Sequence, residues 1–289
     1  MKKMKEREHA GGQIGILICA VVFLISSVEW GRTRMQAVRE ADTIAQLAEL
    51  TRQDTGSVTQ SWPSPQDDFE EGQEKGSSER KMPDQNLQEE NFPEQEKDHE
   101  TRDYAKLSRL NSDFAGWLWI PGTMVDLPVM NDPGDPQKYL RKDFFGKSSA
   151  GGSLFVAEGC GTESDCLLIY GHNMRNGTMF GALRQLDKSD FVKKVYFIYI
   201  ITPTSKILYR IRSSAVWCNK DILYTFSNTP DSIYHFVRAI DLHGTSQSKI
   251  LLLDASKDKK SQWLVLSTCG SDSKTRFFII AQKQNEWRK

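Results

Sequence analysis

Several features that would place this 289-residue sequence in a broad class are missing from it. Lysine plus arginine and aspartate plus glutamate both number 38, so the sequence lacks the basic excess usual in nucleic-acid-binding proteins. It has a single long apolar run, which excludes a polytopic membrane protein. Its five cysteines include no C-x-x-C pair and are too sparse for a disulfide-rich scaffold. We therefore expect no nucleic-acid partner, no structural zinc and no cofactor.

The one apolar run lies near the N-terminus. Residues 14–28 read IGILICAVVFLISSV without a charge, and the mostly apolar stretch 10–30 is long enough to cross a bilayer as a helix. Four basic residues precede the run and three follow it, which favours a cytoplasmic N-terminus. A cleaved signal peptide is the alternative, but no A-x-A site follows. We expect 1–30 to be a short cytoplasmic tail and a single-pass transmembrane anchor, with the rest extracellular.

Two further segments separate this run from the main part of the chain. Residues 31–50 have helical spacing with a weak apolar face, which predicts a juxtamembrane helix. Residues 51–100 contain 14 acidic and five basic residues, four prolines and few apolar side chains. Such a segment cannot bury enough surface to offset its ordering entropy, so we expect a disordered stalk. It is either a tether that sets the reach of the domain above a membrane or a spacer under little constraint.

Residues 101–289 have the composition of a single folded domain. Short strand-like runs bounded by turn signals dominate it, which indicates a mostly β fold, either an antiparallel barrel or a sandwich. Helical spacing is confined to a few segments. The expected strands are 117–120, 124–130, 153–157, 167–170, 195–201, 206–218, 263–266 and 276–282, and the expected helices are 104–110, 179–186, 187–193 and 231–240.

Cys269 differs from the other cysteines in its setting. It follows the apolar run WLVLST, and Arg276 opens the next apolar run seven residues later. If the two runs pair antiparallel, thiol and guanidinium lie at the same end of the sheet, where the guanidinium stabilises a thiolate or a developing oxyanion. The alternative is a buried structural cysteine beside a surface arginine. A bridge between Cys160 and Cys166, across the polar loop GTESD, is a further possibility.

His172 is the candidate partner of the thiol. It stands in IYGHN, directly after an apolar strand and in a glycine-rich turn that leads into a helix. Loop residues placed by a rigid strand are frequent catalytic groups, and a cysteine and a histidine at two strand ends are typical of Cys–His enzymes. A plain surface histidine is the alternative.

Taken together, these motifs resemble the sortases, membrane-anchored cysteine transpeptidases of Gram-positive bacteria. The family pattern TLxTC matches VLSTC at 265–269, with valine in first place, and both LNSDFAGWLWIPGTMVDLPVM and YGHNMRNGTMFGALRQL are similar to class B members. A helix-bearing insertion at about 228–260 is also class B-like. The resemblance covers 104–285 and implies an eight-stranded sortase-type β-barrel with added helices.

The resemblance also implies a mechanism and partners. Cys269 would attack the carbonyl of a threonine in an NPxTN-like sorting signal, His172 would be the general acid and base, and Arg276 would hold the oxyanion. The acyl group would pass to an amine of a lipid-linked peptidoglycan precursor at the cell membrane, which joins a surface protein to the wall. Ser267, Thr268 and Tyr170 would line the peptide site or else pack the strand ends.

Two other functions stay open at this point. A pilin-type or specialised sortase would use a lysine amine, although such polymerases usually carry a second, C-terminal membrane segment and this sequence ends in QKQNEWRK. A non-catalytic wall-binding module on the same barrel is the third reading, and the intact Cys269, His172 and Arg276 argue against it.

Overall fold

A computed structural model of the chain describes residues 26–28, 30–31, 34–52, 98–187, 197–218, 262–270 and 274–289. The chain divides into two units, 1–43 and 44–289, and each is considered by itself. In the first unit the described residues are helical. No helix in the described ranges is both long and apolar enough to span a bilayer. Most of the expected anchor, the expected helix over 231–240 and nearly all of the one over 187–193 lie outside the described residues.

The second unit contains a closed barrel built from eight strands of the described residues. The helix α3 (Tyr104–Leu110) and the 3₁₀ helices η3 (Lys138–Leu140) and η4 (Phe180–Asp187) accompany the strands, besides helical residues at 44–51 and 98–101. The strands are β1 (Phe114–Trp119), β2 (Asp126–Met130), β3 (Leu154–Val156), β4 (Cys166–Tyr170), β5 (Phe197–Ile201), β6 (Ser205–Cys218), β7 (Trp263–Cys269) and β8 (Thr275–Arg288).

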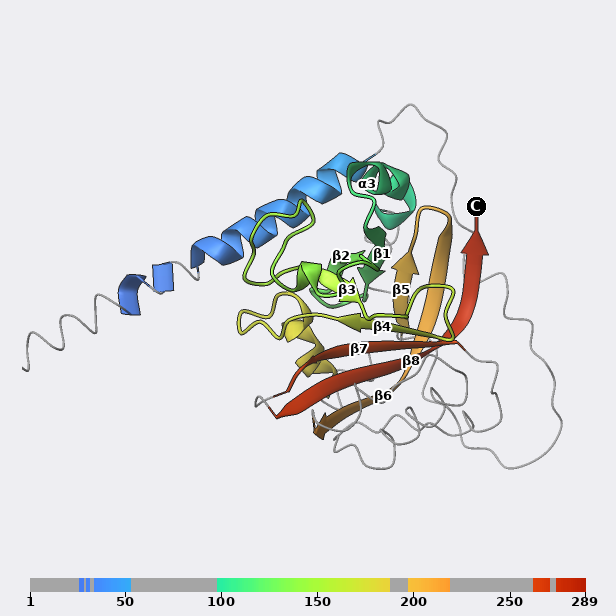
Figure 1. The fold of residues 1–289 in the computed structure, drawn as a ribbon. Helices are drawn as coiled ribbons and strands as arrows, with labels where there is room; N and C mark the ends of the chain where they lie inside the picture. The colour runs from blue at the N-terminus through green and yellow to red at the C-terminus, as the bar shows by residue number, and fades with distance from the viewer. Residues whose placement is uncertain are drawn as a thin grey trace, which may run out of the picture. The chain divides into compact units, whose positions relative to one another are not determined.

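The strand order around the barrel is β1-β2-β3-β4-β7-β8-β6-β5. Most neighbours are antiparallel, but β2 pairs with β3 and β4 pairs with β7 in parallel. Figure 1 shows β7 and β8 side by side, with β4 next to β7. The β4–β7 pair joins segments that are far apart in the sequence, and it brings the two motif-bearing strand ends together.

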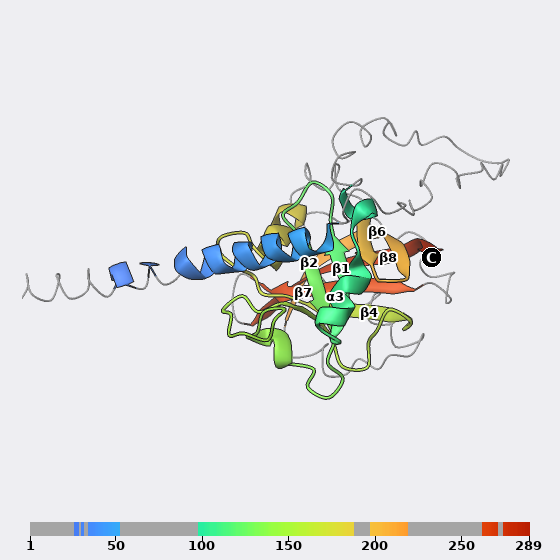
Figure 2. The ribbon, with the colours of Figure 1, turned by 90° about the horizontal axis from the view of Figure 1, so that it is seen from above.

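Apolar side chains on the two faces of the strands form two separate clusters. Leu118 of β1 points into the cluster inside the barrel, whereas its neighbours Trp117 and Trp119 belong to a second cluster that includes Tyr104 and Leu107 of α3. Period-two alternation places successive side chains on opposite faces of a strand, so one short strand supplies both clusters. Helix α3 therefore packs beside β1 on the outside of the barrel (Figure 2).

Both ends of the expected stalk lie in the barrel's own unit. Helical residues 44–51 lead to Arg52, which forms an antiparallel bridge with Arg102, and the N–H of Asp103 donates to the carbonyl of Thr51 at 2.8 Å. Leu47 is fully buried in the cluster that contains α3. Residues 98–101 are helical, and His99 is buried. Residues 53–97 lie outside the described ranges.

A polar group surrounds His99 between this N-terminal segment and the barrel. Its Nδ1 lies 2.7 Å from the Tyr104 hydroxyl, and its Nε2 lies 3.4 Å from Asp126 Oδ1. Arg102 contacts Asp98 and stacks over the ring of Trp117, 5.3 Å from its centroid. Burial raises the pKa of the Asp126 carboxyl against the opposing pull of Arg102. These contacts join α3 and the residues before it to β1 and β2.

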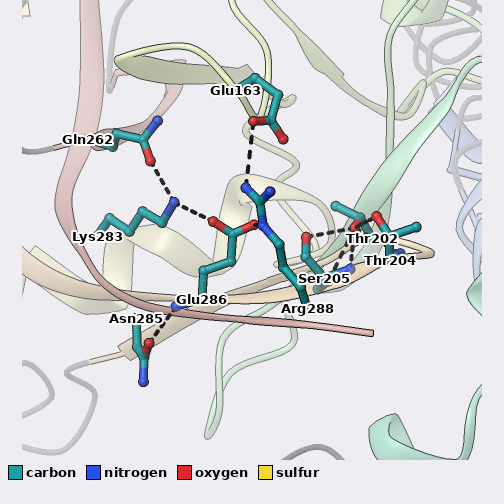
Figure 3. A network of polar contacts seen from close by, with 9 residues as sticks. All are labelled: Glu163, Thr202, Thr204, Ser205, Gln262, Lys283, Asn285, Glu286 and Arg288. Carbon is teal, nitrogen blue, oxygen red and sulfur yellow. Dashed lines mark hydrogen bonds and ion pairs between the residues drawn. The ribbon is translucent and has the colours of Figure 1, made fainter.

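A second polar network lies near the start of β7 and the C-terminal end of β8 (Figure 3). Lys283 Nζ donates to Gln262 at 2.6 Å, just before β7 begins, and lies 2.7 Å from Glu286. Arg288 donates to Glu286 at 2.7 Å and lies 3.8 Å from Glu163. Burial favours the neutral carboxyl of Glu286, but hydrogen bonds from Arg288 and Lys283 outweigh it and hold the pKa below its ordinary value. The network joins the ends of β7 and β8.

The structure confirms a mostly β barrel, although two of its strand pairs are parallel, and it differs from the expectations in further details. The segment 179–186 forms the 3₁₀ helix η4 in place of an α-helix. Strands β7 and β8 run further than expected, to Cys269 and Arg288. Cys160 and Cys166 are buried free thiols, so the suggested bridge is absent, because each thiol packs into the apolar barrel interior. Burial raises the pKa of both thiols.

Candidate active site

Two parallel strands end side by side at the candidate site. Strands β4 and β7 pair from Cys166 opposite Trp263 to Tyr170 opposite Ser267. The ladder continues for one more bond, because the Gly171 N–H donates to the Ser267 carbonyl at 3.2 Å. The C-terminal ends of parallel strands meet at the same edge of a sheet, so the IYGHN turn and the end of the VLSTC strand are neighbours.

Cys269 and Arg276 face each other across the β7–β8 pair. They are the last register partners of the antiparallel ladder, as the spacing predicted. The Cys269 thiol is exposed, and Arg276 Nη1 lies 3.5 Å from its Sγ. This exposure separates Cys269 from the buried thiols of Cys160 and Cys166. A guanidinium at this distance stabilises negative charge on sulfur or on an oxygen bonded next to it.

The His172 imidazole is oriented by a backbone carbonyl. Its Nε2 lies 2.9 Å from the oxygen of Leu140, the last residue of η3. A carbonyl oxygen accepts hydrogen bonds, so this contact places a proton on Nε2. Gly152 allows the close packing behind this carbonyl: its φ is +59°, and a Cβ there would lie 2.6 Å from the Leu140 oxygen. The Leu140 carbonyl, which accepts from the imidazole, is therefore held in place by close packing against Gly152, just before β3.

His172 and Cys269 are joined through Asn173. Among the contacts of the described residues, none links the imidazole directly to Sγ. Asn173 Nδ2 instead donates to the Cys269 carbonyl at 2.6 Å and to the Gly270 carbonyl at 3.4 Å. Arg184 of η4 donates to the same Gly270 carbonyl at 3.0 Å. Asn173 and Arg184 were not predicted from the sequence; the only signal for Asn173 is its place beside His172 in IYGHN.

The three expected peptide-site residues have different surroundings. Ser267 and Thr268 are fully buried, and their hydroxyl oxygens have no hydrogen-bond partner in the described part of the chain. This burial favours strand-end packing over contact with a peptide. Tyr170 is half-buried beside Phe155, with ring centroids 5.5 Å apart, at the same sheet edge as Cys269. A role in peptide binding stays a prediction for all three.

The described residues bring together a thiol, a guanidinium and an imidazole, which is the set needed for nucleophilic acyl transfer. Within the described ranges no cluster of three His, Cys, Asp or Glu side chains is arranged to hold a metal ion. The sortase-domain family model matches residues 118–284, which includes all three groups.

The chain belongs to the sortase family. Sortases are cysteine transpeptidases, so the protein is an enzyme of that type. Two curated relatives carry the name Sortase B. The one from Listeria monocytogenes is 29% identical over 178 residues, which are 60% of this chain and 70% of the relative. The one from Staphylococcus aureus is 24% identical over 192 residues, which are 64% of this chain and 76% of the relative.

Solved class B sortases share the fold. Sortase B of Clostridium perfringens matches with a TM-score of 0.53 at 24% identity, over 63% of this chain and 99% of that structure. A Staphylococcus aureus sortase B–substrate complex matches with a TM-score of 0.54 at 23% identity, over 63% of this chain and 84% of that one. The likeness to these structures confirms the eight-stranded barrel of this sortase.

Proposed function

We propose that this sortase cleaves an NPxTN-like sorting signal of exported proteins after the threonine and transfers the new acyl end to an amine of a peptidoglycan precursor. The observation that supports this most directly is the site itself. An exposed thiol lies 3.5 Å from a guanidinium, and a neighbouring strand end carries an oriented imidazole. The resemblance to class B sortases supports the choice of signal.

In the first half-reaction, the thiol proton of Cys269 passes to His172, and Sγ attacks the threonine carbonyl carbon to form a tetrahedral oxyanion. Arg276 lies beside Sγ and stabilises the negative charge on that oxygen. The C–N bond then breaks, and the departing amine takes a proton from His172, which acts as general acid. The product of this step is a thioester between Cys269 and the surface protein.

In the second half-reaction, an incoming amine attacks the thioester carbonyl. His172, now without its extra proton, accepts one from this amine as general base. The C–S bond breaks, a new amide bond forms, and Cys269 returns to its starting state. The Leu140 carbonyl keeps the imidazole in one orientation through both steps. Tyr170, half-buried at the same sheet edge, is a candidate contact for the bound peptide, whereas the fully buried Ser267 and Thr268 would pack the end of β7 behind the site.

The comparisons and the sequence support the partners in this proposal. A Staphylococcus aureus sortase B has been solved as a substrate complex, and a solved sortase B is described as complexed with triglycine, a peptide with a free amine. For this chain we propose surface proteins with a sorting signal as acyl donors and the lipid-linked precursor as acceptor. The apolar run at 14–28 supports a single-pass membrane location, with a cytoplasmic N-terminus and an extracellular barrel.

The test uses the full-length chain in detergent with two peptide series, of NPxTN and LPxTG type. Triglycine and a lysine side-chain amine serve as competing acceptors. Mass spectrometry follows the acyl adduct on Cys269 and the transpeptidation products. We expect cleavage of an NPxTN-type peptide after threonine. Cys269→Ala should abolish it, and His172→Ala and Arg276→Ala should each lower kcat/KM by about 10²-fold or more.

Each other outcome contradicts a specific part of the proposal. Preference for an LPxTG peptide overturns the signal, and preference for the lysine amine favours the pilin-type reading. Activity that survives Cys269→Ala overturns the nucleophile. If no peptide of either series acylates Cys269, a wall-binding barrel without catalysis becomes the better reading.

A further inference from the structure

The peptide bond that follows the candidate nucleophile is held by two side chains: Asn173, next to His172, and Arg184 of η4. The carbonyl of Cys269 accepts a hydrogen bond from Asn173 Nδ2 at 2.6 Å. The carbonyl of Gly270 accepts one from Arg184 Nη2 at 3.0 Å and a longer one from Asn173 at 3.4 Å. On the other side, the N–H of Gly270 donates to the Thr275 carbonyl at 2.8 Å. The end of β7 is therefore fixed from both neighbours.

The position of Asn173 follows from the parallel ladder. Backbone carbonyls alternate in direction along a strand, so the carbonyl of Cys269 faces the same side as that of Ser267, two residues earlier. The Ser267 carbonyl is bonded by the N–H of Gly171, the last donor that the β4 chain supplies before it turns away. The Asn173 amide takes the place of the next backbone donor. It thereby extends the β4–β7 pairing as far as the nucleophile.

The loop that carries Asn173 is itself tied down next to His172. Asn173 forms a backbone bridge with Met179, and the N–H of Phe180 donates to the His172 carbonyl at 3.0 Å. His172 and Asn173 are adjacent, and their side chains contact different elements: the imidazole contacts the Leu140 carbonyl and the amide contacts the end of β7. A shift of Asn173 relative to Cys269 therefore shifts His172 by a similar amount.

We propose that Asn173, assisted by Arg184, is a positioning residue that fixes the distance between the His172 loop and the Cys269 end of β7. In the contacts of the described residues, its amide reaches two backbone carbonyls and neither Sγ of Cys269 nor the imidazole of His172. It acts through the backbone of the nucleophile, by donating to the Cys269 carbonyl. This role rests on the proposed function, in which His172 and Cys269 act on the same acyl group.

Three substitutions in the full-length chain test the donor role. Asn173→Ala removes the amide, and Asn173→Asp keeps its shape but presents only acceptors to two carbonyls. Arg184→Met removes the second donor. Arg175→Met is the matched control, because Arg175 is exposed on the same loop and takes no part in the contacts to Cys269 and Gly270 described above. The measurements are kcat and KM for acylation by the preferred peptide, the rate of Cys269 alkylation by iodoacetamide at pH 7.5, and thermal unfolding.

We expect Asn173→Ala to lower kcat by about 10- to 100-fold with KM within twofold, because small displacements of reacting groups have effects of this size. Asn173→Asp should be at least as impaired, which a role in packing alone would not produce. Arg184→Met should lower kcat by a smaller factor than Asn173→Ala does. Alkylation of Asn173→Ala should slow by threefold or more, because the Cys269 end of β7 loses its fixed position next to His172. The control should match the wild type throughout, and all unfolding temperatures should agree within about 3 °C.

Other results separate the two proposals. Wild-type kcat and alkylation rate in Asn173→Ala, or recovery of kcat in Asn173→Asp, would overturn the positioning role. Activity that survives Cys269→Ala overturns the proposed function instead. The alkylation measurement needs no peptide, so it decides whether Asn173 holds Cys269 even where no peptide is turned over. If the unfolding temperature of the Asn173 variants fell in proportion to their activity, Asn173 would have a purely structural role.

Discussion

His99 lies where a charged imidazole is strongly disfavoured. It is buried, Arg102 and Lys206 are close enough to repel a positive ring, and together these effects lower its pKa from 6.5 to about 2, burial contributing most. Asp126, 3.4 Å away, and the Tyr104 hydroxyl also face the ring. The contact of Nδ1 with Tyr104 suits a neutral imidazole that accepts there. Unfolding exposes the ring and lets it take up a proton below pH 6.5.

This arrangement predicts a loss of stability in mild acid. The pKa of His99 is lower in the folded than in the unfolded chain, so its contribution is complete above pH 6.5 and declines as the pH falls toward 2. Between pH 8 and pH 5 the free energy of unfolding should fall by about 2 kcal/mol from this residue alone. Urea denaturation of the full-length chain at several pH values measures this fall. His99→Gln should remove that part of the pH dependence; an unchanged slope in the variant would contradict the assignment.

The candidate reacting groups stand in recognisable sequence patterns, whereas the residues proposed to hold them do not. The structure places Cys269 and Arg276 at facing strand ends and His172 in the turn after β4, where the sequence predicted them, and their catalytic roles stay predictions. Asn173 acts through an amide that contacts a backbone 96 positions away, and no local pattern records such a contact. His99 falls within the expected stalk, because the acidic segment 51–100 has few apolar residues. Its burial depends on partners from β1 and β2.

At the scale of elements, the helical residues 44–51 are part of the barrel's unit. Leu47 is fully buried in the cluster that contains Tyr104, Leu107 and Trp117, and Ile44 packs beside it. The helix is then joined to the start of α3 by the bridge between Arg52 and Arg102. This helix and α3 therefore share one apolar cluster with the outside of β1.

Leu47→Ala tests this packing. Removing a fully buried leucine side chain should lower the free energy of unfolding of the barrel by about 2–5 kcal/mol, from lost transfer energy and the cavity left behind. The measurement is chemical denaturation followed by tryptophan fluorescence, which reports on Trp117 and Trp119 in the same cluster. Val38→Ala, at an exposed position of the same helical run, should change stability by no more than about 0.5 kcal/mol. Equal effects of the two substitutions would contradict docking of the helix.

The elements themselves were predicted best where a run is apolar and bounded by turns. The expected strand 276–282 ends where the apolar residues end, yet β8 continues to Arg288. The continuation is polar because its residues pair with β6 in the order Lys283 opposite Tyr209 to Arg288 opposite Ser205. Lateral hydrogen bonding, which a single sequence does not show, sustains a strand beyond its apolar run. The parallel pairing of β4 with β7 was hidden for the same reason.

At the scale of the whole molecule, the 45 residues between Arg52 and Asp98 start and end on the same unit. Replacing 53–97 with a six-residue Gly/Ser linker should leave the fold intact. It should raise the free energy of unfolding by about 1–2 kcal/mol, because the closed loop becomes shorter. Denaturation midpoints, compared at equal m-value, measure the change. A scrambled 53–97 of the same composition should match the wild type, and loss of folding with the short linker would show that this segment contributes contacts of its own.

The parallel pairing of β4 with β7 has a consequence for the order of events during folding. Asn173 and Cys269 are 96 positions apart, and they meet only when this pairing forms. Contacts between such distant segments carry a large closure entropy and form slowly. A chain in which the barrel is still open therefore presents a thiol that has not met its histidine. With the proposed mechanism, chemical competence would arrive together with barrel closure, and a partly folded chain would lack the pairing of thiol and imidazole that acylation requires.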